Sequence, residues 1–427
     1  MEIHVVGPGE NIASIAMQYG VPMSLLMADN RLTSPNQLVQ GQTLVIRFPL
    51  QTHTVRSGET VFQIAAAYGI FIRQLYRNNP ILNGSPELYT GQTLVIEYDE
   101  PPKEGTLSVN GYAYPFIDRT LLQGTLPFLT NLTPFTYGIH PDGSLVDLDD
   151  TALIASASAL GTAPLMHLST LTEDGGFSNE LAHLVLTDAT VQAVLMEQLQ
   201  QTILQKGYAG LDVDFEFVYA EDADAYASFI ARLREMLSPL GLPVIVALAP
   251  KTSSTQPGLL YEGHNYAALG NAADQVLLMT YEWGYTYGPP MAVAPLPNVR
   301  RVVEYALTEI SPAKIWLGVP NYGYDWTLPF IQGESKALSI SNEYAVSLAW
   351  QYGVSISYDA YAQAPFFNYQ DENGRLHEVW FEDARSIRAK LSLIPQYGLW
   401  GGGYWNLMRP FPQNWLVLDS LYSIREE

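Results

Sequence analysis

The first part of the chain contains the same segment twice, and this internal repeat restricts what the segment can fold into. Residues 3–46 and 52–96 align over their whole length, and both copies end on the hexapeptide GQTLVI. Each copy opens with a short alternating stretch that reaches a glycine turn, and apolar residues such as Ile12, Ile15 and Tyr19 then follow at helical spacing. A glycine ends this helix, a second short helix follows, and the β-rich run TLVI completes the copy. The repeat therefore predicts two small βααβ modules in succession.

Each copy resembles the LysM domain over nearly its whole length. That family binds N-acetylglucosamine in chitin or peptidoglycan, so the resemblance implies a peptidoglycan, a cortex glycan or another N-acetylglucosamine polymer as partner. The implied contact loops are the strand–helix turn and the loop after the second helix. The expected glycan-binding residues are Gly9, Glu10, Asn30, Gly58, Glu59, Thr60, Asn79, Pro80 and Ile81. For any one of these residues taken alone, the alternative is a role in turn formation or core packing.

Charge and composition exclude several classes of function. The 427 residues carry 21 basic and 43 acidic side chains, a net charge of −22, whereas a nucleic-acid-binding protein needs a basic surface. The absence of cysteine excludes disulfides, thiolate metal sites and cysteine nucleophiles. The N-terminal residues lack the basic and apolar regions of a signal peptide, and no apolar run approaches the ~20 residues of a membrane span. We therefore expect no nucleic-acid partner, no membrane span and no signal peptide.

From about residue 106 the pattern changes to short apolar runs that alternate with helical segments. The candidate strands are TLSVNGYAY, NLTPFTYGI, APLMHLST, YAGLDVDFE, PVIVALAP, QVLLMTYE, KIWLGVPNY and GLWGGGYWNL. Eight buried strands with helical crossovers predict an α/β fold, a (β/α)8 TIM barrel with its chemistry at the carboxyl ends of the strands. The expected domains are a first module at 1–48, a second at 51–97, a polar, proline-rich linker at 98–105 and the barrel at 106–427.

The segment between the seventh and eighth candidate strands, from Tyr322 to about Phe381, is too long for a simple crossover. It contains FNYQDENGRLHEVWF, which predicts a hairpin with its turn at residues 371–374. We expect a small inserted lobe that forms one wall of a cleft.

Three carboxylates occupy alternate positions in the fourth candidate strand, at Asp212, Asp214 and Glu216. Because the side chains of a strand alternate between its faces, all three point the same way, into the barrel. Burial and like charge then raise the pKa of at least one of them, which keeps a protonated carboxyl beside an ionised one. Such a pair can protonate a leaving-group oxygen. A Mg²⁺ or Ca²⁺ site is the alternative, and it would need further oxygen ligands from elsewhere.

The stretch LDVDFE resembles the DxxDxDxE signature of glycoside hydrolase family 18. MTYE at 279–282 and GVPNYG at 318–323 resemble two further motifs of that family in the same order, and Trp405 falls where the family places a tryptophan under the sugar. Two positions depart from the pattern, since Ala209 replaces the first aspartate and Glu282 the usual aspartate after the tyrosine. The loss at Ala209 weakens any relay along the strand but leaves the three carboxylates intact, so activity is still expected.

The family resemblance implies a substrate-assisted, retaining mechanism. In that mechanism Glu216 is the general acid, Asp214 orients the 2-acetamido group of the substrate, and Asp212 tunes Asp214. Tyr281 is implied to hydrogen-bond the same acetamido group, and Trp405 to stack under the sugar ring.

Side chains that follow the sixth and seventh strands are candidates for the mouth of the cleft. We expect the following to contact substrate: Glu282, Trp283, Tyr322 and Trp326. Core packing is the alternative for each of the aromatic rings. The histidines show no metal-ligand spacing, so we expect no metal and no cofactor.

The whole arrangement, two LysM-like units before a family 18-like barrel, resembles the cortex-lytic N-acetylglucosaminidases of spore-forming bacilli. The resemblance implies an enzyme that hydrolyses β-1,4 bonds of spore cortex peptidoglycan, is anchored by its LysM modules, and lies in the spore coat or cortex. We expect it to be a monomer. The alternatives are a chitinase and a catalytically inactive, lectin-like spore protein.

Overall fold

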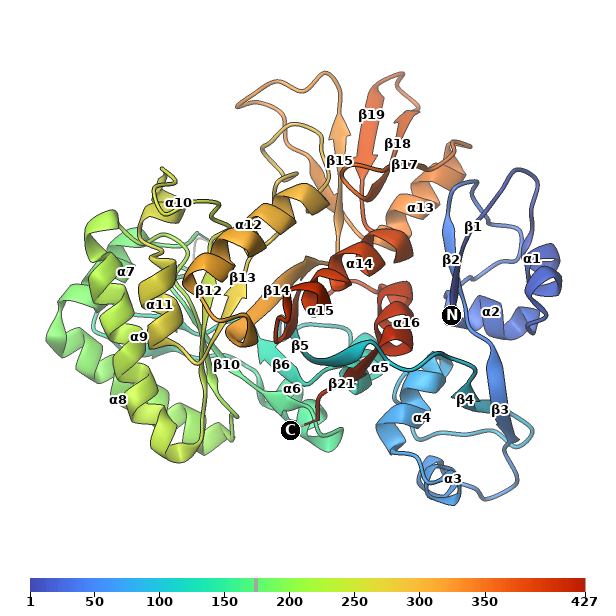
Figure 1. Ribbon diagram of the computed structural model, residues 1–427, viewed down its shortest axis with the longest axis horizontal. Helices are drawn as coiled ribbons and strands as arrows, with labels where there is room; N and C mark the ends of the chain where they lie inside the picture. Colours follow the sequence, from blue (N-terminus) through green and yellow to red (C-terminus); the bar gives the residue numbers. More distant parts are fainter. Residues whose placement is uncertain (173–175, 427) are drawn as a thin grey trace.

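The structure, a computed structural model, describes residues 1–172 and 176–426 and places two small modules beside a barrel (Figure 1). The first module consists of β1 (Glu2–Val5), α1 (Ile12–Tyr19), α2 (Met23–Asp29) and β2 (Thr43–Ile46). The second consists of β3 (Pro49–Thr54), α3 (Val61–Tyr68), α4 (Ile72–Asn78), the 3₁₀ helix η1 (Pro80–Leu82) and β4 (Thr93–Tyr98). The two strands of each module pair antiparallel, so the predicted βααβ units are confirmed.

The first helix of each module begins and ends at residues that satisfy its free backbone groups. Asn11 and Thr60 cap α1 and α3, and each forms a reciprocal pair of hydrogen bonds with the residue three positions later. Gly20 and Gly69 end the two helices in the left-handed conformation, at φ +67° and +66°. The two copies fold alike because the same local signals occur in both.

The rest of the chain forms the predicted (β/α)8 barrel. Its strands are β5 (Gly105–Ala113), β6 (Asn131–Pro134), β9 (Ala163–Pro164), β10 (Met166–Ser169), β11 (Leu211–Asp214), β12 (Val244–Leu248), β13 (Gln275–Leu278), β14 (Ile315–Pro320) and β20 (Gly401–Trp405). They pair in parallel in the order β10-β11-β12-β13-β14-β20-β5-β6-β9. Only Leu165 separates β9 from β10, so the two ends of this order are one continuous run and the sheet closes as eight strands.

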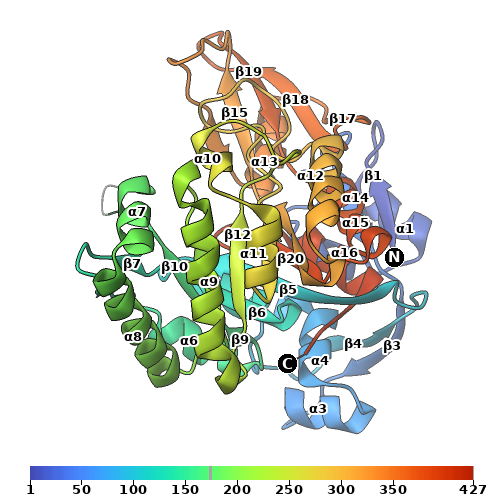
Figure 2. The same cartoon turned by 60° about the vertical axis from the view of Figure 1, so that its left-hand side comes forward.

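Helices cover the outside of the barrel in both views (Figures 1 and 2). They are α5 (Arg119–Thr125), α6 (Thr151–Ala159), α7 (Asn179–Thr187), α8 (Ala189–Lys206), α9 (Ala223–Leu237), α10 (Leu259–Glu262), α11 (Tyr266–Ala272), α12 (Leu296–Glu309), α14 (Ala384–Leu391), α15 (Leu393–Tyr397) and α16 (Pro412–Leu421). Shorter elements are η2 (Leu126–Phe128), β7 (Gly138–Ile139), β8 (Leu145–Val146), η3 (Ala220–Asp222), η4 (Ser238–Leu240), η5 (Pro312–Lys314) and β21 (Tyr422–Ile424). Across residues 1–172 and 176–426, no helix is both long and apolar enough to cross a bilayer.

Two sets of apolar side chains form the core of the barrel. One set fills the interior of the closed sheet and includes Tyr112, Phe135, Ile245, Leu277 and Trp316. The other lies between the outer face of the strands and the helices. This is the packing expected of a barrel whose strands alternate between an inner and an outer face.

The insertion between β14 and β20 is a lobe with its own sheet, and it stands above one end of the barrel in both views (Figures 1 and 2). Its elements are β15 (Gly323–Thr327), β16 (Leu338–Ile340), α13 (Asn342–Gln351), β17 (Ser357–Asp359), β18 (Ala364–Gln370) and β19 (Leu376–Trp380). The sheet has the order β16-β15-β19-β18-β17, and all its pairings are antiparallel. β18 and β19 form the hairpin predicted from the sequence, with Gln370 opposite Leu376.

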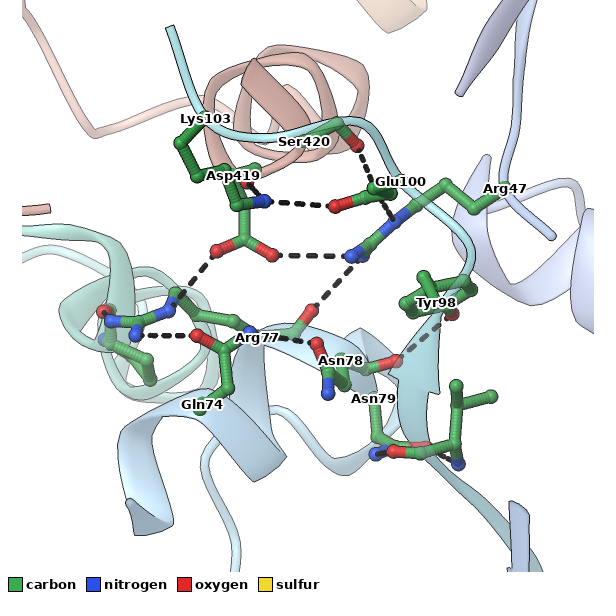
Figure 3. Close-up of polar contacts among 12 residues, drawn as sticks. Arg47, Gln74, Arg77, Asn78, Asn79, Tyr98, Glu100, Lys103, Asp419 and Ser420 are labelled. Carbon is green, nitrogen blue, oxygen red and sulfur yellow. Dashed lines mark hydrogen bonds and ion pairs between the residues drawn. The ribbon is translucent and has the colours of Figure 1, made fainter. Parts of the chain in front are cut away.

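A buried aspartate of the barrel joins the two modules to it (Figure 3). Asp419 of α16 pairs with Arg47 at 3.2 Å, just after β2, and with Arg77 of α4 at 3.1 Å. Arg47 also pairs with Glu100 at 3.2 Å, and Glu100 in turn accepts a 2.8 Å hydrogen bond from Lys103. We call these four residues, Arg47, Arg77, Glu100 and Asp419, the Asp419 junction. The segment between β4 and β5 is therefore fixed to α16 and does not act as a free tether.

The first module also contacts the insertion through its backbone. The N–H of Ile356 donates to the carbonyl oxygen of Gln40 at 2.9 Å. Next to it, Gly41 adopts φ +88°, and a Cβ built there would lie 1.9 Å from the carbonyl oxygen of Ile356. In the second module the equivalent Gly91 has the same φ but no atom within 4 Å of such a Cβ. Of these two equivalent glycines, it is Gly41 that is required for close contact with another part of the chain.

Gly41→Ala should destabilise the protein more than Gly91→Ala. Both variants place a side chain in the left-handed region, at a cost of about 1 kcal/mol each. Gly41→Ala additionally forces the first module away from Ile356, which should cost about 1–3 kcal/mol more, as overpacking does. Thermal denaturation of the two variants measures the difference. Equal losses of stability would contradict the close contact between the module and the insertion.

Candidate active site

The three alternating carboxylates lie at the carboxyl end of β11, where barrels of this kind place their chemistry. Asp212 and Asp214 are buried, and Glu216, just past the end of the strand, is partly exposed. Phe215 points the opposite way and stacks on Tyr226 of α9 at a ring-centroid distance of 5.6 Å. The strand thus presents its acids to one face and anchors the other face on a helix.

Asp212 has one hydrogen-bond donor, the hydroxyl of Tyr112 on β5, which lies 2.6 Å from Oδ2. The other oxygen, Oδ1, is buried without a hydrogen-bond partner among the described residues. Burial raises the pKa of Asp212 to about 7, and the hydrogen bond from Tyr112 acts in the opposite direction. Near neutral pH, Asp212 therefore lies between its protonated and ionised forms.

Asp214 lies beside a histidine that carries no charge. Nε2 of His167, on the neighbouring strand β10, is 3.9 Å from Oδ2 of Asp214, and its Nδ1 is 2.6 Å from Oγ1 of Thr136. Burial lowers the pKa of His167 to about 3, so the ring does not neutralise a negative charge on Asp214 at physiological pH. Burial, and then the charges of Glu216 and Asp212, raise the pKa of Asp214 well above its usual range.

Glu216 is the most exposed of the three carboxyls. Burial and the charge of Glu282 raise its pKa to about 7. His264 holds the main chain at this point, since its Nε2 lies 3.0 Å from the carbonyl oxygen of Phe215 and 3.2 Å from that of Glu216. A carboxyl with this pKa can hold a proton near neutral pH and give it to a leaving group.

Glu282, in the loop after β13, is tied to the first strand of the insertion. Its Oε1 accepts hydrogen bonds from the hydroxyl of Tyr322 and, at 3.1 Å, from that of Tyr324. Its backbone is left-handed, at φ +67°, a conformation that is uncommon for residues other than glycine and that occurs at functional sites. The two tyrosines therefore hold the Glu282 carboxylate where its charge acts on Glu216.

Tyr281 is buried near the carboxylates. Burial, followed by the charges of Asp214 and Glu216, raises the pKa of its hydroxyl. Gly318 of β14 leaves space for the tyrosine, because a Cβ there would lie 2.8 Å from Cε1 of Tyr281 and 2.3 Å from the carbonyl oxygen of Leu278. This close approach is the physical reason for the first glycine of GVPNYG.

Trp405 belongs to an aromatic cluster at the carboxyl ends of β5, β6 and β20. Its ring centroid lies 4.9 Å from that of Phe135, 5.7 Å from Tyr112 and 6.2 Å from Tyr114. Because Tyr112 also donates to Asp212, the cluster adjoins the carboxylates. Trp405 is partly exposed, as a ring that stacks on a sugar must be.

The two tryptophans expected at the cleft mouth lie in different environments. Trp283 is half-buried and lines a cavity of about 530 Å³ together with Pro250 and Arg301. Trp326 is 1% exposed, and its Nε1 donates to the carbonyl oxygen of Gly288 at 2.8 Å. The structure favours the core-packing alternative for Trp326, because β15 directs this ring into the core and leaves no exposed face for a sugar.

The side chains of Asn30 and Asn79 form hydrogen bonds within their own modules. Each is buried, donates from Nδ2 to one carbonyl in the preceding helix and one in the last strand, and accepts from that strand at Oδ1. The structure gives both side chains a folding role, and their contacts with a glycan stay a prediction. Pro80 and Ile81 follow in η1, and the Ile81 side chain is exposed.

The strand–helix turns of the modules use their acidic residues for folding. Glu10 and Glu59 each accept one hydrogen bond from a histidine and one from a backbone N–H, at 2.6–2.9 Å. Within these turns Gly9 and Gly58 adopt φ +76° and +83°, and Thr60 caps α3. For these five predicted residues the structure shows a folding role.

Tyr112 and His167 adjoin the carboxylates but have no prediction from the sequence. A signal for Tyr112 is present, since Ser108, Asn110 and Tyr112 alternate with apolar residues in β5 as the three acids do in β11. His167 lies in the run MHLS, where the same alternation is too short to stand out. Among the described residues, no group of three or more His, Asp and Glu side chains is arranged to hold a metal ion.

The chain was compared with protein families and with known proteins. It matches the family described as Glycosyl hydrolases family 18 over residues 162–409, and the LysM domain over residues 4–47 and 53–97. These are the two families that the sequence motifs resemble, and both predictions are confirmed.

Two of the similar proteins align with nearly the whole chain. The Cortical fragment-lytic enzyme of Bacillus subtilis (strain 168) is 40% identical over 430 residues, which cover 99% of this chain and 99% of that protein. The crystal structure of the Bacillus cereus spore cortex-lytic enzyme SleL matches with a TM-score of 0.84 at 37% identity, and covers 100% of this chain and 98% of that chain. A chitinase structure from Chromobacterium violaceum ATCC 12472 matches with a TM-score of 0.69 at 26% identity, over 74% of this chain and 98% of that chain. The chain therefore belongs to glycosyl hydrolase family 18 and carries two LysM domains ahead of its catalytic barrel.

Proposed function

We propose that this enzyme hydrolyses β-1,4 glycosidic bonds of spore cortex peptidoglycan, at N-acetylglucosamine residues. The observation that carries the proposal is the series of carboxyls along β11, which ends at Glu216 with a pKa of about 7. Two similar proteins are named for action on the spore cortex, and both align with nearly the whole chain.

In the proposed reaction the substrate's own acetamido group is the nucleophile. Glu216 gives its proton to the glycosidic oxygen while the acetamido carbonyl oxygen attacks C1, which forms an oxazolinium ion. Asp214 accepts a hydrogen bond from the acetamido N–H and stabilises the developing positive charge. Glu216, now ionised, takes a proton from the water that attacks C1, and the original configuration is restored.

The remaining groups position the substrate and these two acids. Asp212, which is held by the Tyr112 hydroxyl, tunes the charge on Asp214. Tyr281 offers its hydroxyl to the acetamido group. Trp405 stacks under the sugar ring from the far side of the barrel mouth.

This mechanism restricts which sugar occupies the cleavage site. The attacking oxygen must come from a free 2-acetamido group, so a muramic δ-lactam, whose nitrogen is tied up in the lactam ring, cannot serve. New reducing ends should therefore carry N-acetylglucosamine.

In this proposal the LysM domains hold the enzyme on the glycan and raise the local concentration of cleavable bonds. The enzyme would act in the spore, where the named relatives have their substrate. One chain supplies all the catalytic groups, so we propose a monomer. Its mass in solution, compared with the 47.3 kDa of the chain, checks this point.

Glu216→Gln should abolish cleavage of purified cortex fragments, because the amide keeps the shape but has no proton to give. Loss of a general acid costs about 10²- to 10⁴-fold in rate. The measurement is mass spectrometry of reduced digestion products. Wild type should release fragments that end in reduced N-acetylglucosamine. Glu221→Gln, an exposed carboxylate nearby in the sequence, is the matched control and should cleave normally.

Other outcomes of the same digestion would overturn the proposal. Reducing-end muramic δ-lactam from wild type would exclude the acetamido mechanism. Cleavage of chitin without cleavage of cortex would favour a chitinase, a candidate supported by the similarity to the Chromobacterium violaceum chitinase structure. Cleavage of neither polymer would favour a lectin-like role.

Glu282→Gln should shift the alkaline limb of the pH–rate profile to lower pH. The Glu282 charge opposes ionisation of Glu216 and so raises its pKa, hence removal of that charge lowers the pKa. The protonated acid is then lost at a lower pH than the wild-type value of about 7. The profile of kcat/KM against pH for the two proteins tests this, since it reports the free enzyme. An alkaline limb at an unchanged pH would show that Glu282 does not act on the acid.

A further inference from the structure

A polar cavity of about 530 Å³ lies beside the catalytic loops, at the side of the barrel mouth formed by β12 and β13. Its walls come from the loop after β12, from Trp283 in the loop after β13, and from the first turns of α12. In the sheet order, β12 and β13 directly follow β11, which carries the acids. The volume falls in the range of small-molecule sites, roughly 300–1,000 Å³, and the reaction proposed above gives this cavity no role.

The charge of this cavity is opposite to that of the molecule as a whole. The chain has a net charge of −22, yet among the described residues no Asp or Glu lines the cavity, whereas Arg301 does. Glu262 follows the lining residue Tyr261 in α10, but it acts on another group: burial lowers the pKa of Lys251, and the charge of Glu262 opposes that shift. A positively charged cavity in an acidic protein is a place where an anion can bind.

Arg301 is exposed, and part of its guanidinium is free to bind a ligand. Its Nη2 donates to Oδ1 of Asn298, three residues earlier in α12, at 2.8 Å, which orients the group. Its Nε and Nη1 have no partner among the described residues, and none of their carboxylates forms an ion pair with it. The planar set of donors of a guanidinium matches the two oxygens of a carboxylate.

The loop after β12 adds uncharged donors. Oε1 of Gln256 accepts from the backbone N–H of Thr252 at 2.7 Å and from its hydroxyl at 3.2 Å, so the loop closes on itself. Ser253 and Thr255 also line the cavity, and in the described part of the chain their hydroxyls have no hydrogen-bond partner. Both hydroxyls can donate to a carboxylate that Arg301 binds.

The position of the cavity selects the part of the substrate that can reach it. Trp283 directly follows Glu282, whose charge acts on Glu216, whereas Trp405 lies on β20, beyond β14. In the proposed reaction Trp405 lies under the N-acetylglucosamine that is attacked, and Glu216 protonates the leaving oxygen. The cavity is therefore on the leaving side of the bond. In a polymer in which N-acetylglucosamine alternates with muramic residues, the leaving sugar is a muramic residue.

We propose that this cavity binds a carboxylate of the peptide carried by the muramic residue on the leaving side of the cut bond. Arg301 pairs with the carboxylate, and Ser253 and Thr255 donate to it. A muramic δ-lactam carries no peptide, so the enzyme should prefer a peptide-bearing muramic residue at this position. The inference rests on the proposed function for the identity of the polymer, but the site lies outside the groups that make and break bonds.

The test compares two soluble cortex fragments of equal glycan length whose peptide amines are acetylated. In one the peptide carboxyls are free, and in the other they are converted to amides, which removes their charge. Wild type should cleave the fragment with free carboxyls with a kcat/KM about three- to tenfold higher. The difference should lie in KM, because an interaction made equally in the ground state and the transition state changes binding alone.

Variants of the cation identify the group that reads the carboxylate. Arg301→Gln should remove the preference, because the amide can donate but has no charge. Arg301→Lys keeps the charge without the planar fork and should retain part of the preference. Arg232→Gln, at an exposed arginine of α9 outside the cavity, is the matched control and should retain all of it. Equal thermal stability of the variants shows that folding is intact.

The outcomes separate this inference from the proposed function. Equal kcat/KM of wild type on the two fragments would show that the inference is wrong, and so would a full preference in Arg301→Gln. Either result leaves the proposed function standing if both fragments are cut after N-acetylglucosamine. Failure of wild type to cut either fragment would overturn the proposed function and this inference together.

Discussion

The active site depends on keeping three carboxyl groups of one strand away from water without giving them a cation. In the described part of the chain no lysine or arginine pairs with Asp212, Asp214 or Glu216; their neighbours are the Tyr112 hydroxyl and the uncharged His167. A cation would lower the pKa of each acid and release its proton. Burial, together with the charges of neighbouring acids, therefore keeps the pKa values of these carboxyls raised, and a carboxyl that holds its proton near neutral pH can act first as an acid and then as a base.

Buried charges also join the two LysM domains to the barrel, at the Asp419 junction. Arg47 and Arg77 come from different LysM domains, and a single carboxylate of α16 pairs with both. Removal of one partner from a buried pair of this kind leaves an uncompensated charge, at a cost of roughly 3–5 kcal/mol. The junction thus makes the orientation of both domains on the barrel a condition of folding.

Local sequence patterns predicted most of the fold and the centre of the site. The features that they did not predict depend on contacts between residues that are distant in the sequence. Period-two alternation identified Asp212, Asp214 and Glu216 because the information lies within one strand. Asn30 in a loop looks the same in sequence whether it donates to a sugar or to its own strand, and only the fold shows the latter. Trp326 follows the seventh strand as expected, but the direction of its ring depends on β15. Arg47 and Asp419 are 372 residues apart in the sequence, so no local sequence pattern predicts their contact.

The close contact of Gly41 with Ile356 and the Asp419 junction remove the freedom of motion that a flexible linker would give. A catalytic domain joined to its binding domain by a flexible linker can reach many glycosidic bonds around the point where the binding domain is held. Here the LysM domains and the barrel are joined as one body. In the proposed function, the distance along the glycan between the sugar held by the LysM domains and the bond that is cut is therefore set by the fold itself.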